Sequence, residues 1–311
     1  MIRTRYRALV TGGGGFLGTH LLAALQEAGH EIHTTLRPGG SRLPPPLQRS
    51  VRTHEVDLGR FEAVRTVVGE IRPDVIYHAA FPSAYADLSL RDQVAGGPLV
   101  LANLLDAAKR PGLSRFVHLG SFLEYGPSEQ AHREDDLPKP ATLRGAVKAA
   151  ETQLVLGRTR SGDVPGVVLR VFSAYGSWEP AHRLVPKAIT AALLGCELPL
   201  TAPGIGRDFV HAADVAAACL KAAVSDSAVG ETFNVGGGRH VTNEEMVAEI
   251  ERVSNRSIQV LRGAYGAHPT DGQVCRADIS KTERILGWTP TDLPVGLQET
   301  IAWMDRSGSR D

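Results

Sequence analysis

A glycine-rich stretch near the start of the chain, TGGGGFLG at residues 11–18, constrains the possible folds more than any other feature. The apolar segment at residues 6–10 precedes it and predicts a buried strand. Leucines follow at helical spacing up to Gly29, which predicts a helix. The glycines therefore occupy a strand-to-helix turn, in which the amides of the first helical turn face an anion such as a pyrophosphate.

The spacing of three glycines indicates what this turn binds. Gly12 permits the tight turn, Gly15 lets the backbone approach a pyrophosphate, and Gly18 lets the helix pack against the strand. Phe16 and Leu17 begin the helix beside them. We therefore expect a dinucleotide cofactor over this turn, with the first helix starting near residues 15–16.

Predicted strands and helices alternate through the N-terminal half of the chain. Strands are expected at residues 31–36, 51–57, 73–80, 115–120 and 167–171, and helices at 61–71, 97–109 and 143–156. This alternation predicts an α/β fold, a Rossmann-like, doubly wound, mostly parallel sheet with helices on both faces. The pattern loosens after residue 176. We therefore expect a dinucleotide-binding domain over residues 1–176 and a smaller C-terminal substrate lobe over 177–311, interleaved with the last strands.

The composition excludes several classes of protein. The 34 basic and 34 acidic side chains balance, which leaves no electrostatic footprint for nucleic acid or an anionic membrane. Three widely spaced cysteines, Cys196, Cys219 and Cys275, predict reduced thiols and neither a disulfide framework nor a metal site. No signal peptide is visible, and no apolar run approaches the ~20 residues of a membrane span. We expect a cytoplasmic protein.

Several motifs, taken in order, resemble the extended short-chain dehydrogenase/reductases, and among them the nucleotide-sugar epimerase/dehydratase family. The glycine turn resembles TGGxGFxG, SFLEYG at 121–126 resembles S-x-x-x-Y-G, and RVFSAYG at 170–176 resembles R-x-F-N-x-Y-G. GIGRDFV at 204–210 resembles the segment whose arginine grips a substrate diphosphate. The resemblance covers nearly the whole chain and implies an NAD(P)-dependent homodimeric enzyme acting on a nucleotide-linked sugar.

The resemblance also implies contacts to the cofactor. Asp57 would cap the adenine amino group, with Leu58 beside the ring, and the HAA segment at 78–80 would flank the cofactor. The implied cofactor contacts are Gly12, Gly15, Phe16, Leu17, Gly18, Arg37, Asp57, Leu58, Ala79, Ala80, Lys148 and Val171.

Arg37 decides which dinucleotide we expect. It follows the second predicted strand, where the adenine ribose lies in such folds. A carboxylate there would bind the ribose hydroxyls and repel a 2′-phosphate, whereas a guanidinium can pair with that phosphate. We therefore expect NADP(H) in preference to NAD(H), with NAD(H) left possible.

For the substrate, the resemblance implies that Arg207 holds the diphosphate and that Ser173 stands where the family has Asn. The implied substrate contacts are Tyr85, Ser173, Leu184, Val185 and Arg207.

The expected catalytic residues depart from the family pattern. The family places a Tyr four residues before a Lys, because a phenol beside a cation can give and take the proton that accompanies hydride transfer. Lys148 is present, but Arg144 stands in the Tyr position, and an arginine cannot act as a base. Gly97 replaces the family's helix Asn as well. The candidate catalytic residues are Ser121, Lys148, Arg144 and Glu124.

Three explanations follow. Another residue supplies the proton, the candidates being Glu124, Tyr85, His182 and Tyr175. Alternatively, Arg144 and Ser121 polarise a ketone while solvent protonates the alkoxide, which suits a one-way reductase. In the third, the protein binds cofactor without turnover.

Among reactions, we expect reduction of a nucleotide-linked keto sugar, with epimerisation through a transient ketone as the alternative. Phe122 and Leu123 stand where the dehydratase branch has Asp-Glu, which disfavours 4,6-dehydration. Two neighbouring cations on one helix face also lead us to expect an anion, Glu124 or a bound ligand, between Arg144 and Lys148.

Overall fold

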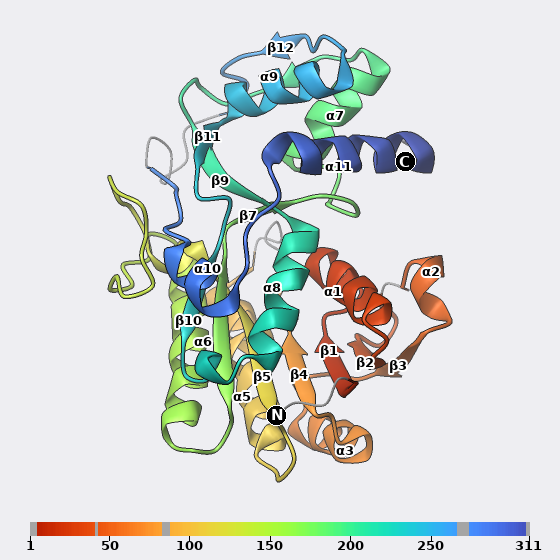
Figure 1. The fold of residues 1–311 in the computed structure, drawn as a ribbon, viewed down its shortest axis with the longest axis vertical. Coiled ribbons are helices and arrows are strands. Elements are labelled where there is room, and N and C mark those ends of the chain that lie inside the picture. The colour runs from red at the N-terminus through yellow and green to blue at the C-terminus, as the bar shows by residue number, and fades with distance from the viewer. Residues whose placement is uncertain (1–4, 41–42, 83–87, 266–273, 309–311) are drawn as a thin grey trace.

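The computed structural model describes residues 5–40, 43–82, 88–265 and 274–308. Its centre is a seven-stranded parallel sheet with the strand order β10-β6-β5-β4-β1-β2-β3 (Figure 1). The strands are β1 Arg7–Thr11, β2 Glu31–Leu36, β3 Val51–Glu55, β4 Val75–His78, β5 Arg115–Ser121, β6 Gly166–Val171 and β10 Thr232–Val235. The order reverses between β1 and β4, which is where a doubly wound sheet binds its ligand. The expected Rossmann-like fold is confirmed.

Alternation along the strands explains why helices cover both faces of the sheet. In β1, Ala8 and Val10 pack with the apolar faces of α1 (Phe16–Glu27) and α8 (Ala212–Val224). Leu9, which points to the opposite face, packs with α3 (Phe61–Ile71), α5 (Pro98–Ala108) and α6 (Leu143–Arg160). Two separate apolar clusters therefore hold the helices on the two sides of one sheet.

A second lobe has a core of its own. Its three-stranded sheet contains β7 (Ser173–Tyr175), β9 (Gly206–His211) and β11 (His240–Thr242), and a small pair joins β8 (Leu198–Pro199) with β12 (Val260–Leu261). The helices are α7 (Leu184–Leu194), α9 (Asn243–Ser254) and α11 (Leu293–Ser307), which Figure 1 shows gathered at one end of the molecule. Between these lobe segments the chain returns to the large sheet as α8, β10 and α10 (Ser280–Leu286). The division of the chain at residue 176 stays our proposal.

Two details differ from the expected elements. The helix expected over 97–109 is α5, and the short helix α4 (Leu90–Gly96) ends immediately before it, with Gly97 between the two. The long helix expected over 143–156 continues to Arg160, because Thr142 caps its first turn and nothing breaks the helix before Ser161. One further short helix, α2 (Pro45–Gln48), precedes β3. Of the helices that the structure describes, none has the length and apolar character needed to cross a membrane.

Candidate active site

The glycine turn joins β1 to α1 at the carboxyl edge of the sheet. Gly12 has a φ of +76°, and a Cβ there would lie 2.7 Å from the Ala80 Cα, so backbone from two strand ends meets closely at this point. A Cβ on Gly18 would collide with the Gly12 carbonyl group. The first helix begins at Phe16, as expected, and Gly15 at its N-cap has no side chain with which to cap it. The amides of the first turn are therefore placed to receive an anion.

Ala79 and Ala80 follow β4 and lie against this turn. The Ala79 amide donates to the Thr11 carbonyl at 3.1 Å, which extends the pairing of β1 with β4 beyond the end of the strand. The HAA segment therefore flanks the glycine turn. Val171 ends β6 and is buried.

The residues expected to contact the adenosine end of the cofactor follow the ends of β2 and β3. These strands pair in register up to Leu36 and Glu55, so Arg37 and Asp57 follow at one edge. Arg37 is exposed and its carbonyl closes a turn with the Gly40 amide at 2.8 Å. The Leu58 carbonyl accepts a hydrogen bond from Asn103 Nδ2 at 2.9 Å. Asn103, on α5, is a supporting residue that the sequence reasoning missed, since no motif contains it.

Ser121 and Glu124 form a local cap at the end of β5. Ser121 Oγ accepts from the Leu123 amide at 3.2 Å, and Glu124 Oε1 accepts from the Ser121 amide at 2.8 Å. The other Glu124 oxygen pairs with Arg170 Nε at 2.9 Å, and the side chain is fully buried. Both carboxylate oxygens are thus held by structural partners. The S-x-x-E spacing is that of a capping box, a signal that could have identified this role from the sequence.

Lys148 and Arg144 share the Phe81 ring. Lys148 is buried, and its Nζ lies 4.1 Å from the ring centroid, with the Arg144 guanidinium at 4.5 Å. Arg144 also donates from Nη1 to the Pro82 carbonyl at 3.1 Å. Arg144 is therefore folded over the segment that follows β4. Phe81 was not singled out from the sequence, because a lone aromatic residue after a strand carries no pattern.

The anion beside Lys148 is Glu151. Glu124, one of the two anions expected between the cations, does not lie there, because it pairs with Arg170. Lys148 Nζ lies 2.8 Å from Glu151 Oε2 and donates to the Leu119 carbonyl at 2.9 Å. Burial raises the pKa of Glu151, but the Lys148 ammonium and His118 outweigh burial and lower this pKa to about 2. Glu151 is therefore ionised at neutral pH. Glu124 cannot take this role, because its capping box and Arg170 hold it elsewhere.

The other candidate proton donors lie in different surroundings. Tyr175 belongs to the core of the second lobe, where burial raises its pKa well above the usual value and its hydroxyl donates to the Leu293 carbonyl at 3.4 Å. His182 is exposed in the loop before α7. Tyr85 lies outside the described residues.

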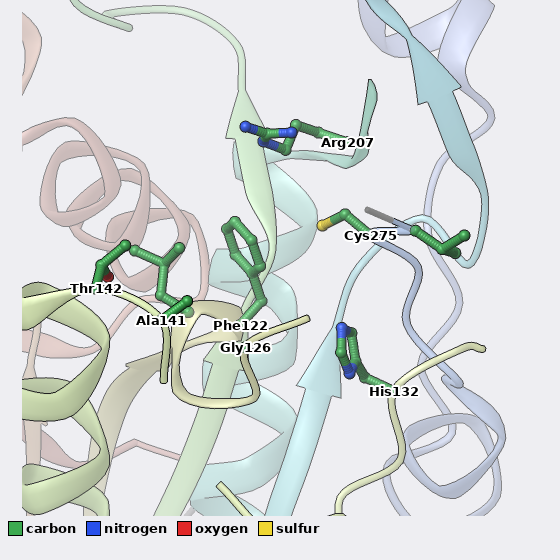
Figure 2. A pocket seen from close by; sticks show the side chains of 9 residues that line it. Phe122, Gly126, His132, Ala141, Thr142, Arg207 and Cys275 are labelled. Carbon is green, nitrogen blue, oxygen red and sulfur yellow. The ribbon is translucent and has the colours of Figure 1, made fainter. Parts of the chain in front are cut away.

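A pocket between the two lobes contains Arg207, one of the expected substrate contacts. It is lined by Phe122, Leu123, Gly126, His132, Ala141, Thr142, Arg207, Val274 and Cys275. Figure 2 shows Phe122 pointing towards Arg207, with the Cys275 sulfur turned towards Phe122. Burial raises the pKa of Cys275 to about 12, so it is a neutral thiol in this wall. The pocket therefore combines one guanidinium with mostly apolar or neutral surroundings.

Three of the expected substrate contacts lie outside this lining. Ser173 begins β7 and is buried, and Leu184 and Val185 begin α7. The Val185 side chain belongs to the core of the second lobe, so a ligand would meet its backbone. His132 and Cys275 were missed as lining residues, because isolated residues in loops form no recognisable motif.

Comparison with known proteins finds a family model and relatives that match most of the chain. The model of the NAD dependent epimerase/dehydratase family matches residues 8–236. A dTDP-glucose 4,6-dehydratase of Actinoplanes sp. is 27% identical, covering 96% of this chain and 97% of the relative. A UDP-glucose 4-epimerase of Azospirillum brasilense is 28% identical, covering 91% of this chain and 87% of the relative. The solved structure of MoeE5 in complex with UDP-glucuronic acid and NAD is 27% identical, with a TM-score of 0.86 over 97% of this chain and 100% of that one.

Proposed function

Because this chain belongs to the NAD-dependent epimerase/dehydratase family of nucleotide-sugar enzymes, we propose that it reduces a keto group of a nucleotide-linked sugar with NADPH. The observation that carries this proposal is the Arg144–Phe81–Lys148 arrangement. It places a permanent cation where a reversible proton carrier would be needed for a two-way reaction. A one-way reduction needs only a polarised carbonyl and a proton from solvent.

The residues present fit a dinucleotide cofactor. Gly12 and Gly18 allow the backbone of the turn to pack closely, because a Cβ at either would collide with backbone, and the first turn of α1 has amides to offer to a pyrophosphate. Lys148 has three N–H donors. One goes to the Leu119 carbonyl and one faces Glu151, so a third is left for a ribose hydroxyl. Arg37 supports NADP(H), while MoeE5, the structural relative, is described with NAD. A bound nicotinamide would supply the hydride.

The chain's own residues would then manage the charge that develops on the carbonyl oxygen. Ser121 Oγ accepts from the Leu123 amide, so its hydroxyl proton is available to donate to the substrate oxygen. Arg144 adds a fixed positive charge on the helix beside it. Neither group would transfer its proton to the substrate, and the alkoxide would be protonated by water.

Arg207 supports the assignment of the substrate. Its guanidinium lies in the pocket that reaches Phe122 and Thr142, near the end of β5 where Ser121 stands. A guanidinium can pair bidentately with a diphosphate, while the apolar wall of Phe122 faces the sugar end. MoeE5 is described in complex with a UDP-sugar, which supports the same class of ligand here.

Epimerisation is the second candidate, supported by the likeness to the Azospirillum brasilense epimerase. It would require a base for the oxidation half, and Arg144 cannot serve as one. Dehydration is supported less, although dTDP-glucose 4,6-dehydratases are among the relatives. Phe122 stacks on Phe172 with ring centroids 5.4 Å apart, so the position after Ser121 offers an apolar wall and no proton-transfer group. Cytoplasmic location and a homodimer stay predictions.

The decisive experiment incubates the protein with NADPH or NADH and a panel of UDP- and dTDP-linked keto sugars. We expect loss of absorbance at the nicotinamide band together with formation of one reduced sugar. Interconversion of two sugar epimers without net cofactor consumption would favour the epimerase. Cofactor binding with no product from any sugar would favour a non-catalytic dinucleotide-binding protein.

Arg207→Ala tests the substrate assignment. Loss of a charge-assisted contact worth roughly 1.5–3 kcal/mol should weaken nucleotide-sugar binding about 10- to 100-fold. Cofactor affinity should stay nearly unchanged, and both are measured by calorimetry. Arg65→Ala, which removes an exposed arginine on α3, is the matched control. Unchanged sugar affinity would remove the main support for a nucleotide-linked substrate.

A further inference from the structure

Two departures from the family pattern meet at one place in the structure. Gly97 stands where the resemblance expects Asn, and an ideal Cβ built on it would lie 2.8 Å from Glu151 Oε1 and 2.7 Å from the Phe81 ring. Its φ of −113° is outside the left-handed region, and the space around it is what the two neighbouring side chains occupy. The missing side chain thus makes room for a carboxylate and an aromatic ring.

Glu151 and its neighbours form a buried chain of polar groups beneath the active site. Glu151 Oε2 lies 2.8 Å from Lys148 Nζ and 3.5 Å from His118 Nε2. The His118 ring stacks on His78 at 5.3 Å, and His78 Nδ1 lies 2.7 Å from Thr11 Oγ1. Burial lowers the pKa of His118 and of His78 below the usual value, so both rings are neutral. Lys148 and Glu151 are therefore the charged pair of this buried chain.

We propose that Glu151, accommodated by Gly97, is the positioning residue of this active site: it holds the Lys148 ammonium in place and keeps it charged. The proposal deepens the proposed function, because it concerns how Lys148 serves the cofactor. A buried lysine without a counterion gives up its proton readily, since burial disfavours the charged form. Glu151 supplies this counterion, with its Oε2 2.8 Å from Lys148 Nζ, and holds Lys148 in place as a donor.

Among the residues that the structure describes, no other charged group facing this pair takes over the task. Arg144 lies on the same helix and is also a cation, His118 on β5 and His78 on β4 are neutral, and Glu124 is held by Arg170. The remaining charges on α4 and α5 belong to three exposed side chains, which are Arg91, Asp92 and Asp106.

The test replaces Glu151 with Gln, which keeps the shape and removes the charge. The Lys148 ammonium is followed by proton–nitrogen NMR of the free protein, with Lys148→Met to assign its signal, and NADPH and NADH affinities are measured from pH 6 to pH 9. In the wild type we expect the signal to persist and the affinities to change less than about threefold. In Glu151→Gln the signal should be lost as the pH rises, and the affinity should fall about tenfold or more.

Glu62→Gln is the matched control, because Glu62 pairs with Arg65 at the same three-residue helical spacing but in an exposed position. It should behave as the wild type. Gly97→Ala is a second test, for the case in which Glu151→Gln does not fold. Its Cβ should displace the Glu151 carboxylate and retain all charges. We expect the same pH-dependent loss of cofactor affinity. In Glu151→Gln/Lys148→Met the pH dependence should vanish.

An unchanged Lys148 signal and flat affinities in both Glu151→Gln and Gly97→Ala would overturn the proposal. The NMR reading needs neither cofactor nor sugar, so it separates this inference from the proposed reduction. A protein that reduces no sugar but shows the expected Lys148 titration would contradict only the proposed function.

Discussion

Arg144 differs most from what the family pattern would place in the site, and its contacts favour one explanation for it. The guanidinium donates to the Pro82 carbonyl and lies over Phe81, on the segment that flanks the glycine turn. A side chain that merely filled a vacated position would have no need of these contacts. Recruitment to orient a carbonyl or an anionic substrate group is the explanation we favour.

Arg144→Tyr should therefore lower the turnover of keto-sugar reduction and raise KM. The change removes the fixed charge and its bond to Pro82, and a positioned polar group is worth about 10²–10⁴ in rate. Steady-state kinetics of wild type and variant give both constants. Arg160→Tyr, on an exposed position of the same helix, is the control. A rise in turnover would instead show that the chain lacks only the family's tyrosine.

Arg37 sets the predicted preference for the cofactor. It is exposed at the end of β2, in register with the end of β3, where an adenine ribose would lie. Arg37→Asp should weaken NADP(H) binding by roughly 1.5–3 kcal/mol and change NAD(H) binding far less. Fluorescence titration with both cofactors measures this, with Arg49→Asp as an exposed control. Equal losses for the two cofactors would mean that Arg37 does not contact a 2′-phosphate.

At the scale of elements, the same capping pattern occurs twice: once at the start of a long helix and once at the start of a single 3₁₀ turn. The T-x-x-E pattern at Thr242 predicts the start of a helix, and α9 does begin at Asn243 with both reciprocal bonds made. The S-x-x-E pattern at Ser121 produces an equivalent cap on a single 3₁₀ turn. Local patterns of this kind depend on neighbouring backbone alone, so the sequence contains what is needed to recognise them.

Thr242→Ala should lower the free energy of unfolding by about 1 kcal/mol, because the Glu245 amide loses its partner at 3.1 Å. Urea denaturation measures the change, and Thr242→Ser should retain most of the stability. The pKa of Glu245 is lowered, mainly by the hydrogen bond that its carboxylate accepts from the Thr242 amide. The contribution of Glu245 is therefore complete above its unfolded pKa of about 4.5 and is lost as the pH falls below it. A variant as stable as the wild type at pH 7 would contradict this account.

At the scale of the whole molecule, the apolar surface of α4 and α5 supports the predicted homodimer. Leu90, Val94 and Leu99 are 58%, 41% and 47% exposed and line one shallow groove. Leu154 of the neighbouring α6 is 39% exposed as well. Exposed apolar side chains gathered on adjacent helices are typical of a surface that a partner covers. We propose that a second copy of the chain covers it.

Val94→Glu/Leu99→Glu should therefore convert a dimer into a monomer, since each change would bury a charge between the two copies. Sedimentation velocity at micromolar concentration measures the assembly. Leu261→Glu, at an exposed position in β12, should leave the dimer intact. A wild-type protein that sediments as a monomer would refute the dimer.

The sequence by itself determined the features that depend on residues close together in the chain. The glycine spacing of residues 12–18 requires a strand-to-helix turn, because a Cβ at Gly12 or Gly18 would meet backbone. Alternating apolar strands and helices then build a parallel sheet with both faces covered, since each element must bury its apolar side. The sheet, the first helix and the cap of α9 follow from these rules, and the structure agrees with each of them.

Only the tertiary structure decided which charged side chains lie together in the candidate active site. Glu151 lies one helical turn from Lys148 on α6, which the sequence spacing contains. Its burial against His118 of β5 and beside Gly97, at the start of α5, depends on how these elements pack together. The sequence offered Glu124 as the nearby anion, but the burial of that carboxylate against Arg170 removes it from the cations. Spacing along a helix offers several possible charge pairs, and only the packing of the elements decides which of them is buried and which carboxylate is held elsewhere.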